Sequence, residues 1–136
     1  MLEIYSKGVT VASNADVPLN TVALIKGTST VPLGASSIQL TKCGIYKVTV
    51  SGSVIGSAAG VVTLQMEKNG VAEPAAITTI TAADATSLNA IGFTTLVQVP
   101  SNNNLNCPCA TSTTISFRNT GIAATYNTID VVVTRV

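Results

Sequence analysis

The 136-residue chain contains no histidine. Histidine is the commonest general base near neutral pH, the usual partner of a serine or cysteine nucleophile, and the commonest metal ligand in proteins. The six acidic residues are Glu3, Asp16, Glu67, Glu73, Asp84 and Asp130. Because none lies close to another in the sequence, no local carboxylate pair or calcium-binding loop is recognisable. We therefore predict a protein that is not an enzyme and has no catalytic residues, no metal site and no cofactor.

Charge and aromatic side chains are also scarce. Charged residues make up 10% of the chain and aromatic residues 4%, and the formal net charge is +1. The basic stripe and the stacking platforms of a nucleic-acid-binding protein are both missing, so we expect no nucleic-acid partner. No apolar run approaches the roughly 20 residues that span a bilayer as a helix, so we expect no membrane insertion. Residues 1–7 lack the basic and apolar regions of a secretory signal.

Apolar residues, in contrast, are abundant. They make up 46% of the chain, and the mean hydropathy is +0.49. A domain of this length built from short strands leaves part of this apolar surface outside its own core. That surface is expected to be buried against other subunits, which predicts an oligomer.

Helix signals are almost absent from the chain. The best helix candidate, residues 82–88, is too short to be stable and is expected to form a loop. Strand signals recur throughout, separated by Gly, Pro, Asn and Ser, and no composition break divides the chain. We therefore predict one all-β domain over residues 1–136, an antiparallel β-sandwich of the jelly-roll type. The expected strands are residues 2–6, 9–13, 21–26, 37–41, 45–55, 61–68, 76–81, 90–99, 113–119 and 127–136.

Alternation of apolar and polar residues is clearest in residues 44–54 and 62–67. Side chains alternate between the two faces of a strand, so each segment has one apolar face and one face nearer water. The Asn69-Gly70 pair that follows suits a type I′ hairpin turn, because both residues tolerate positive φ. The core residues predicted from these patterns are Tyr46, Val48, Val50, Leu64 and Phe117.

The last strand is apolar on both faces. Ile129, Val131 and Val133 share one face, while Val132 and Val136 make the other face partly apolar. A strand that is apolar on both faces is usually covered on both faces. One cover is the core, and the other is expected to be a neighbouring subunit.

Three cysteines, Cys43, Cys107 and Cys109, leave several states open. A structural zinc site needs four ligands, and no histidine is available as the fourth. A bridge between Cys107 and Cys109 would be a strained small ring, whereas Cys43 can pair with either of them if the fold brings the two within bridging distance. The interpretation we favour is free thiols in a reducing cytosol, because no signal peptide is present.

The order of these motifs resembles the C1q and tumour-necrosis-factor-like superfamily. The resemblance rests on the strand before Gly44-Ile45-Tyr46, the Asn69-Gly70 hairpin, residues 93–99, residues 115–119 and the apolar last strand. It covers most of residues 9–136 and implies a ten-stranded jelly roll assembled as a homotrimer. The chain departs from the family pattern because an Asn-rich loop stands where a Gly-Asp dipeptide often precedes the penultimate strand. The Thr/Ala/Val-rich texture is similar to versions encoded by bacteria and their phages.

From the resemblance and the missing catalytic groups we expect a structural protein of a virion, made in the host cytoplasm. It would be a trimeric phage head decoration or fibre subunit that binds the capsid or another virion protein. Residues 1–8 are the expected anchoring segment, and the alternatives are a trimeric adhesin that recognises cell-surface glycans and a spore-surface structural protein. The expected trimer contacts are Val132, Val136 and Ile129, and the expected capsid anchor is formed by Leu2, Ile4 and Tyr5.

Overall fold

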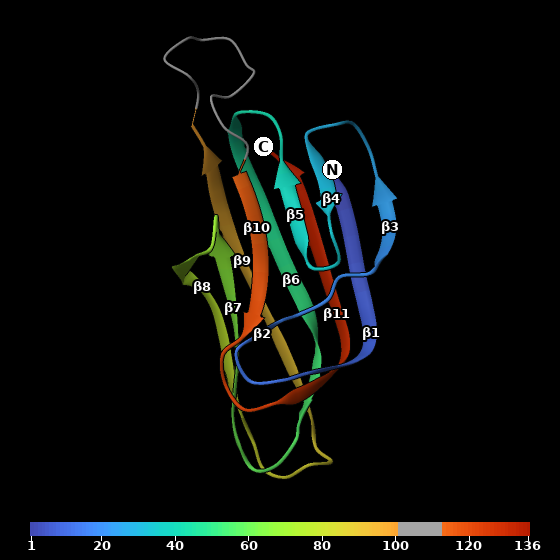
Figure 1. Cartoon of the computed structure of the whole chain (residues 1–136), viewed down its shortest axis with the longest axis vertical. Coiled ribbons are helices and arrows are strands. Elements are labelled where there is room, and N and C mark those ends of the chain that lie inside the picture. Colours follow the sequence, from blue (N-terminus) through green and yellow to red (C-terminus); the bar gives the residue numbers. More distant parts are fainter. Residues whose placement is uncertain (101–112) are drawn as a thin grey trace.

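The computed structural model describes residues 1–100 and 113–136, and these form two antiparallel sheets packed face to face (Figure 1). Sheet A has the strand order β3 (Thr21–Ile25), β1 (Leu2–Val11), β11 (Ala124–Arg135), β6 (Gly44–Gly56) and β9 (Leu88–Val99). Sheet B has the order β4 (Thr30–Leu33), β5 (Ser37–Leu40), β10 (Thr113–Asn119), β7 (Gly60–Lys68) and β8 (Val71–Ala82), and the short β2 (Ala15–Asp16) pairs with β10. The predicted all-β sandwich of the jelly-roll type is confirmed.

The observed strands differ from the expected ones at β1, β2, β4 and β8, the last of which begins at Val71 where a start at residue 76 was expected. The expected strands 2–6 and 9–13 merge into the single strand β1, which ends at Val11, because its pairing with β11 continues across Gly8, which has a φ of 64°. The strands β2 and β4 were not predicted from the sequence. β2 has only two residues, and β4 contains Pro32, which is accommodated because β4 lies at the edge of sheet B.

Two connections form as expected. Asn69 and Gly70 have φ values of 52° and 80°, as a type I′ turn requires. Residues 83–87 form a loop, in which the Asp84 carboxylate accepts hydrogen bonds from the backbone N–H groups of Thr86 and Ser87 at 2.9 and 2.8 Å. These hydrogen bonds stabilise the charged form and lower the pKa of Asp84 to about 2.

The core lies between the two sheets, with β6 near its centre. The Phe93 ring of β9 and the Phe117 ring of β10 meet across the sandwich with centroids 6.3 Å apart. Gly52 of β6 lies so close to β11 that a Cβ atom there would collide with the carbonyl oxygen of Thr128. The five predicted core residues all lie in this core with at most 2% of their surface exposed: Tyr46, Val48, Val50, Leu64 and Phe117.

A buried asparagine closes one end of the sandwich. The Asn119 side-chain amide donates to the carbonyl oxygens of Val11 and Ile122, and its Oδ1 accepts from the Tyr126 hydroxyl at 3.2 Å. Both side chains are fully buried, and burial raises the pKa of Tyr126. This network joins the end of β1 to the connection between β10 and β11.

The polar face of β7 is drier than the sequence indicates. Gln65 and Glu67 are both buried. A bulge in β8 covers Gln65, and the Nε atom of Arg118 lies 3.3 Å from the Oε1 atom of Glu67. The Gln65 amide donates to the carbonyl oxygens of Glu73 and Ala76, at 2.6 and 3.2 Å. These bonds satisfy backbone groups that lose their ladder partners in the bulge.

Cys43 is disulfide-bonded. The preferred interpretation of this residue as a free thiol is therefore wrong. The chain's other two cysteines, Cys107 and Cys109, lie outside the described residues, as does nearly all of the loop predicted at residues 100–109. The described part of the chain contains no helix able to cross a membrane.

Candidate functional site

The candidate site is the outer face of sheet A, which is the side of that sheet turned away from the core. Alternate residues of β1, β11, β6 and β9 point to this side. Most of them are threonine, serine or apolar residues. The face comprises Glu3, Tyr5, Lys7, Ile45, Lys47, Thr49, Ser51, Ser53, Thr94, Leu96, Thr128, Asp130, Val132 and Thr134.

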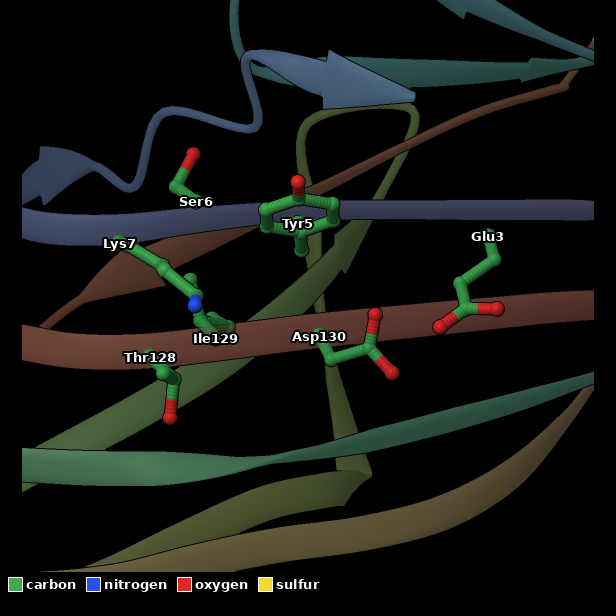
Figure 2. Close-up of a pocket in the computed structure, with 7 residues that line it drawn as sticks. All are labelled: Glu3, Tyr5, Ser6, Lys7, Thr128, Ile129 and Asp130. Atoms are coloured by element: carbon green, nitrogen blue, oxygen red, sulfur yellow. The ribbon is translucent and has the colours of Figure 1, made fainter. Parts of the chain in front are cut away.

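A cavity of about 250 Å³ opens on this face over the paired strands β1 and β11 (Figure 2). These strands are adjacent in sheet A, and their register pairs Tyr5 with Asp130 and Lys7 with Thr128. The lining residues are Glu3, Tyr5, Ser6, Lys7, Thr128, Ile129 and Asp130. The site therefore combines two carboxylates, an ammonium group, a phenol and hydroxyls.

The carboxyl groups of Glu3 and Asp130 are neighbours at one end of this cavity, with the Lys7 ammonium drawn at the other end (Figure 2). Within residues 1–100 and 113–136, the buried Oδ1 atom of Asp130 accepts no hydrogen bond from any donor. Burial raises the pKa of Asp130 above its ordinary value, and the negative charge of Glu3 raises it further. The two acids are far apart in sequence, so only the pairing of β1 with β11 brings them together.

The expected trimer contacts fall in three different environments. Val132 is half-buried on the outer face of sheet A, between Glu3 of β1 and Thr49 of β6. Val136 follows β11, is 79% exposed, and donates its N–H to the carbonyl oxygen of Ile45. Ile129 is completely buried in the core of the single chain, so its assignment to a subunit contact is wrong.

The expected capsid anchor also needs correction. Leu2 and Ile4 are buried in the core with at most 2% exposure, because β1 pairs with β11 on one side and with β3 on the other. Tyr5 points to the outer face, where it is half-buried. Residues 2–6 are thus part of an internal strand of sheet A, and Leu2 and Ile4 have no surface with which to hold a capsid.

Apolar side chains gather at one end of the outer face. Leu96 of β9 is 66% exposed and Ile45 of β6 is 46% exposed, and their strands are paired so that the two lie diagonally across from each other. The exposed Val136 is hydrogen-bonded through its backbone to Ile45. Surface of this kind is typical of protein contacts.

No metal-binding arrangement is visible in the described part of the chain. There, no group of three or more His, Cys, Asp or Glu residues is placed to hold an ion. The pair Glu3 and Asp130 supplies two carboxylates and no third ligand of these types.

Several solved structures share this fold over nearly the whole chain. Murine APRIL at pH 5.0 matches with a TM-score of 0.66 and 9% identity, over 96% of each chain. The Eiger TNF structure from S. frugiperda matches with a TM-score of 0.65 and 11% identity, over 96% of this chain and 90% of that one. The globular domain of the zebrafish complement 1qA protein matches with a TM-score of 0.61 and 5% identity, over 96% of this chain and 92% of that one.

The domain therefore has the C1q/TNF-like jelly-roll fold, as the order of its sequence motifs indicated. No family model matches the chain, and no curated protein is similar to it in sequence. Identities of 5–11% establish the fold alone.

Proposed function

We propose that this chain is a non-enzymatic structural subunit that assembles as a homotrimer through the outer face of sheet A. The observation that carries the proposal is the composition of that face. Ile45, Leu96 and Val136 are exposed together in a single chain, and the charged residue of the face nearest to them in register is Lys47, which is paired with Leu96. Burying these side chains removes apolar surface from water, which favours association.

The place we propose for the trimer is the surface of a virion, as a head decoration or fibre subunit. A decoration protein acts through binding, since whatever binds only the assembled shell raises the stability of that shell. The disulfide at Cys43 supports a position exposed to oxidising surroundings, because disulfides persist on virion and cell surfaces and are rare in the cytosol. The low charge of the chain favours contacts that survive moderate salt.

The first expected result is the mass of the assembly. Light scattering at micromolar concentration should give about three times the chain mass of 13.8 kDa. A trimer is expected because the exposed apolar side chains need a protein partner and the resemblance to the superfamily implies threefold assembly. A mass near 13.8 kDa would contradict the trimer.

The second expected result concerns the position of the subunit contact. Val132→Asp should convert the trimer to monomer, because an unpaired charge in an apolar interface costs several kcal/mol. Ile77→Asp is the matched control, since Ile77 is an exposed apolar residue of β8 on the opposite sheet. If Val132→Asp keeps the trimer mass, or if Ile77→Asp loses it, the subunit contact lies elsewhere.

The virion assignment has its own test. Immunogold electron microscopy with an antibody against the purified protein should label particles made by the cells that express it, before and after a wash in moderate salt. Trimers that never co-purify with a particle would refute the virion role without contradicting the proposed homotrimer.

The cavity favours one second candidate, a binding module for cell-surface glycans. Tyr5 offers an aromatic ring at its opening, and Glu3 and Asp130 offer acceptors for sugar hydroxyl groups. Binding of glycans to a chain that stays monomeric, lost in Tyr5→Ala, would favour this role. The two candidates are distinguishable because a trimer contact at Val132 covers the same face.

A further inference from the structure

We propose that assembly of the trimer is proton-linked, because covering the outer face of sheet A forces the Glu3 and Asp130 carboxyl groups of each subunit to share a proton. This inference rests on the proposed homotrimer and adds how its assembly responds to pH. Subunits in which the Glu3 and Asp130 pair holds a proton would associate tightly, and subunits in which both groups are charged would associate weakly.

The first step is that the carboxyl pair has no cation of its own. The ion pairs among the described residues are both made by Arg118, which lies in sheet B, with Asp16 and Glu67. Neither Glu3 nor Asp130 therefore has a Lys or Arg nitrogen within ion-pair distance in the described part of the chain. Two carboxylates side by side without a cation repel each other, and one proton between them removes that repulsion.

The second step is that Asp130 has an unused acceptor. Its Oδ1 atom is buried and receives no hydrogen bond from the described residues, although a buried acceptor without a donor is costly. A proton on the Asp130 carboxyl removes the unpartnered charged acceptor and supplies an O–H donor toward Glu3. Protonation of Asp130 is already favoured in the single chain, since burial and the charge of Glu3 raise its pKa.

The third step concerns the groups that face Asp130 from the neighbouring strands. On β1 these are Glu3, Tyr5 and Lys7, and Lys7 lies at the far end of the cavity (Figure 2). On β6 the residue paired with Asp130 is Ser51, and Lys47 lies two outward positions further along, opposite Thr134. Neither β3 nor β9 contains a charged residue. The sheet itself thus supplies little compensation for a buried negative charge.

The fourth step is the effect of a covering subunit. A neighbour that excludes water from this face increases the dehydration that already disfavours the charged pair, so the raised pKa rises further in the trimer. The assembled state then binds more protons than the free subunit. The stabilisation of the trimer is fully present below the Asp130 pKa of the free subunit, which already lies above the ordinary value of 3.8, and it is lost as the pH rises through the higher pKa of the trimer.

The test measures the trimer association constant by sedimentation velocity from roughly pH 4 to pH 8, in wild type and three variants. For wild type, each proton taken up on assembly should raise the association constant about tenfold for each pH unit of acidification. One proton in each of three subunits therefore gives up to about a thousandfold per pH unit. Asp130→Asn should assemble as tightly near neutral pH as wild type does in acid, with little pH dependence. Glu3→Gln should also make the association constant nearly independent of pH. This second variant keeps the test decisive if Asp130→Asn does not fold.

Glu73→Gln is the matched control, because it removes a carboxylate from sheet B and should leave the profile of wild type unchanged. Trimers whose association constant is independent of pH would overturn the proton linkage and keep the proposed trimer. Weaker assembly of Asp130→Asn near neutral pH would also overturn it, because the carboxylate would then be pairing with a cation of the neighbour. A wild-type chain that is monomeric at every pH would refute the proposed trimer and this inference together.

Discussion

Replacing Tyr46 by alanine is expected to lower the free energy of unfolding by about 3–5 kcal/mol, the range found for large aromatic truncations in cores. Tyr46 is completely buried on β6, between β11 and β9. Its ring fills space between the two sheets near the start of β6, and truncation leaves a cavity that the paired strands on both sides prevent from collapsing. Chemical denaturation monitored by circular dichroism measures this change.

The hydroxyl group of Tyr46 gives the experiment a graded control. It donates to the carbonyl oxygen of Lys42 at 2.6 Å and so ties the residues before β6 to the core. Tyr46→Phe keeps the ring and removes this hydrogen bond, so it should cost only about 1 kcal/mol. If Tyr46→Ala costs no more than Tyr46→Phe, the ring is not the core anchor that its burial indicates.

The sequence was sufficient for features decided by residues close together in the chain. The alternation of Tyr46, Val48 and Val50 fixes one buried face of β6, since successive side chains of a strand point to opposite sides. The Asn69-Gly70 turn likewise depends on the positive φ tolerated by these two residues. Local patterns of this kind, in their order along the chain, were enough to predict the jelly roll.

The features that were missed depend on pairing between distant segments. Alternation groups Ile129 with Val131 and Val133 but does not say which face of the strand is the core. In the fold, Ile129 faces the core, and Val132 faces outward. The neighbourhood of Glu3 and Asp130 arises from the register of β1 with β11, which no spacing in the sequence reports.

The first strand illustrates the same limit with a larger consequence. Leu2 and Ile4 lie near one end of the chain, and their position suggested a free anchoring segment. In the fold they belong to β1, which has hydrogen-bonded neighbours on both sides. Position along the chain therefore gave no information on whether the segment is an internal strand.

Ile4→Ala is accordingly expected to destabilise the domain by about 2–5 kcal/mol, as for other truncations of buried isoleucine. Ile4 pairs with Val131 of β11 and Val22 of β3, and its side chain is 2% exposed. The loss should be visible as a lower denaturation midpoint with an unchanged slope, since the folded and unfolded states remain the same in kind. Removal of residues 2–6 should go further and prevent folding, because β11 and β3 then lose the strand between them.

The adjacent Tyr5 provides the control that separates a core strand from an anchoring segment. Tyr5 belongs to the same strand but points to the outer face, so Tyr5→Ala should cost far less stability than Ile4→Ala. An anchoring segment would give the opposite pattern, in which both variants fold with wild-type stability and only attachment to a partner is lost. A truncated chain that lacks residues 2–6 and still unfolds cooperatively at the wild-type midpoint would show that β1 contributes nothing to the core. The burial of Leu2 and Ile4 between the two sheets argues for the first pattern, because an internal strand cannot leave its sheet without exposing the side chains that it covers.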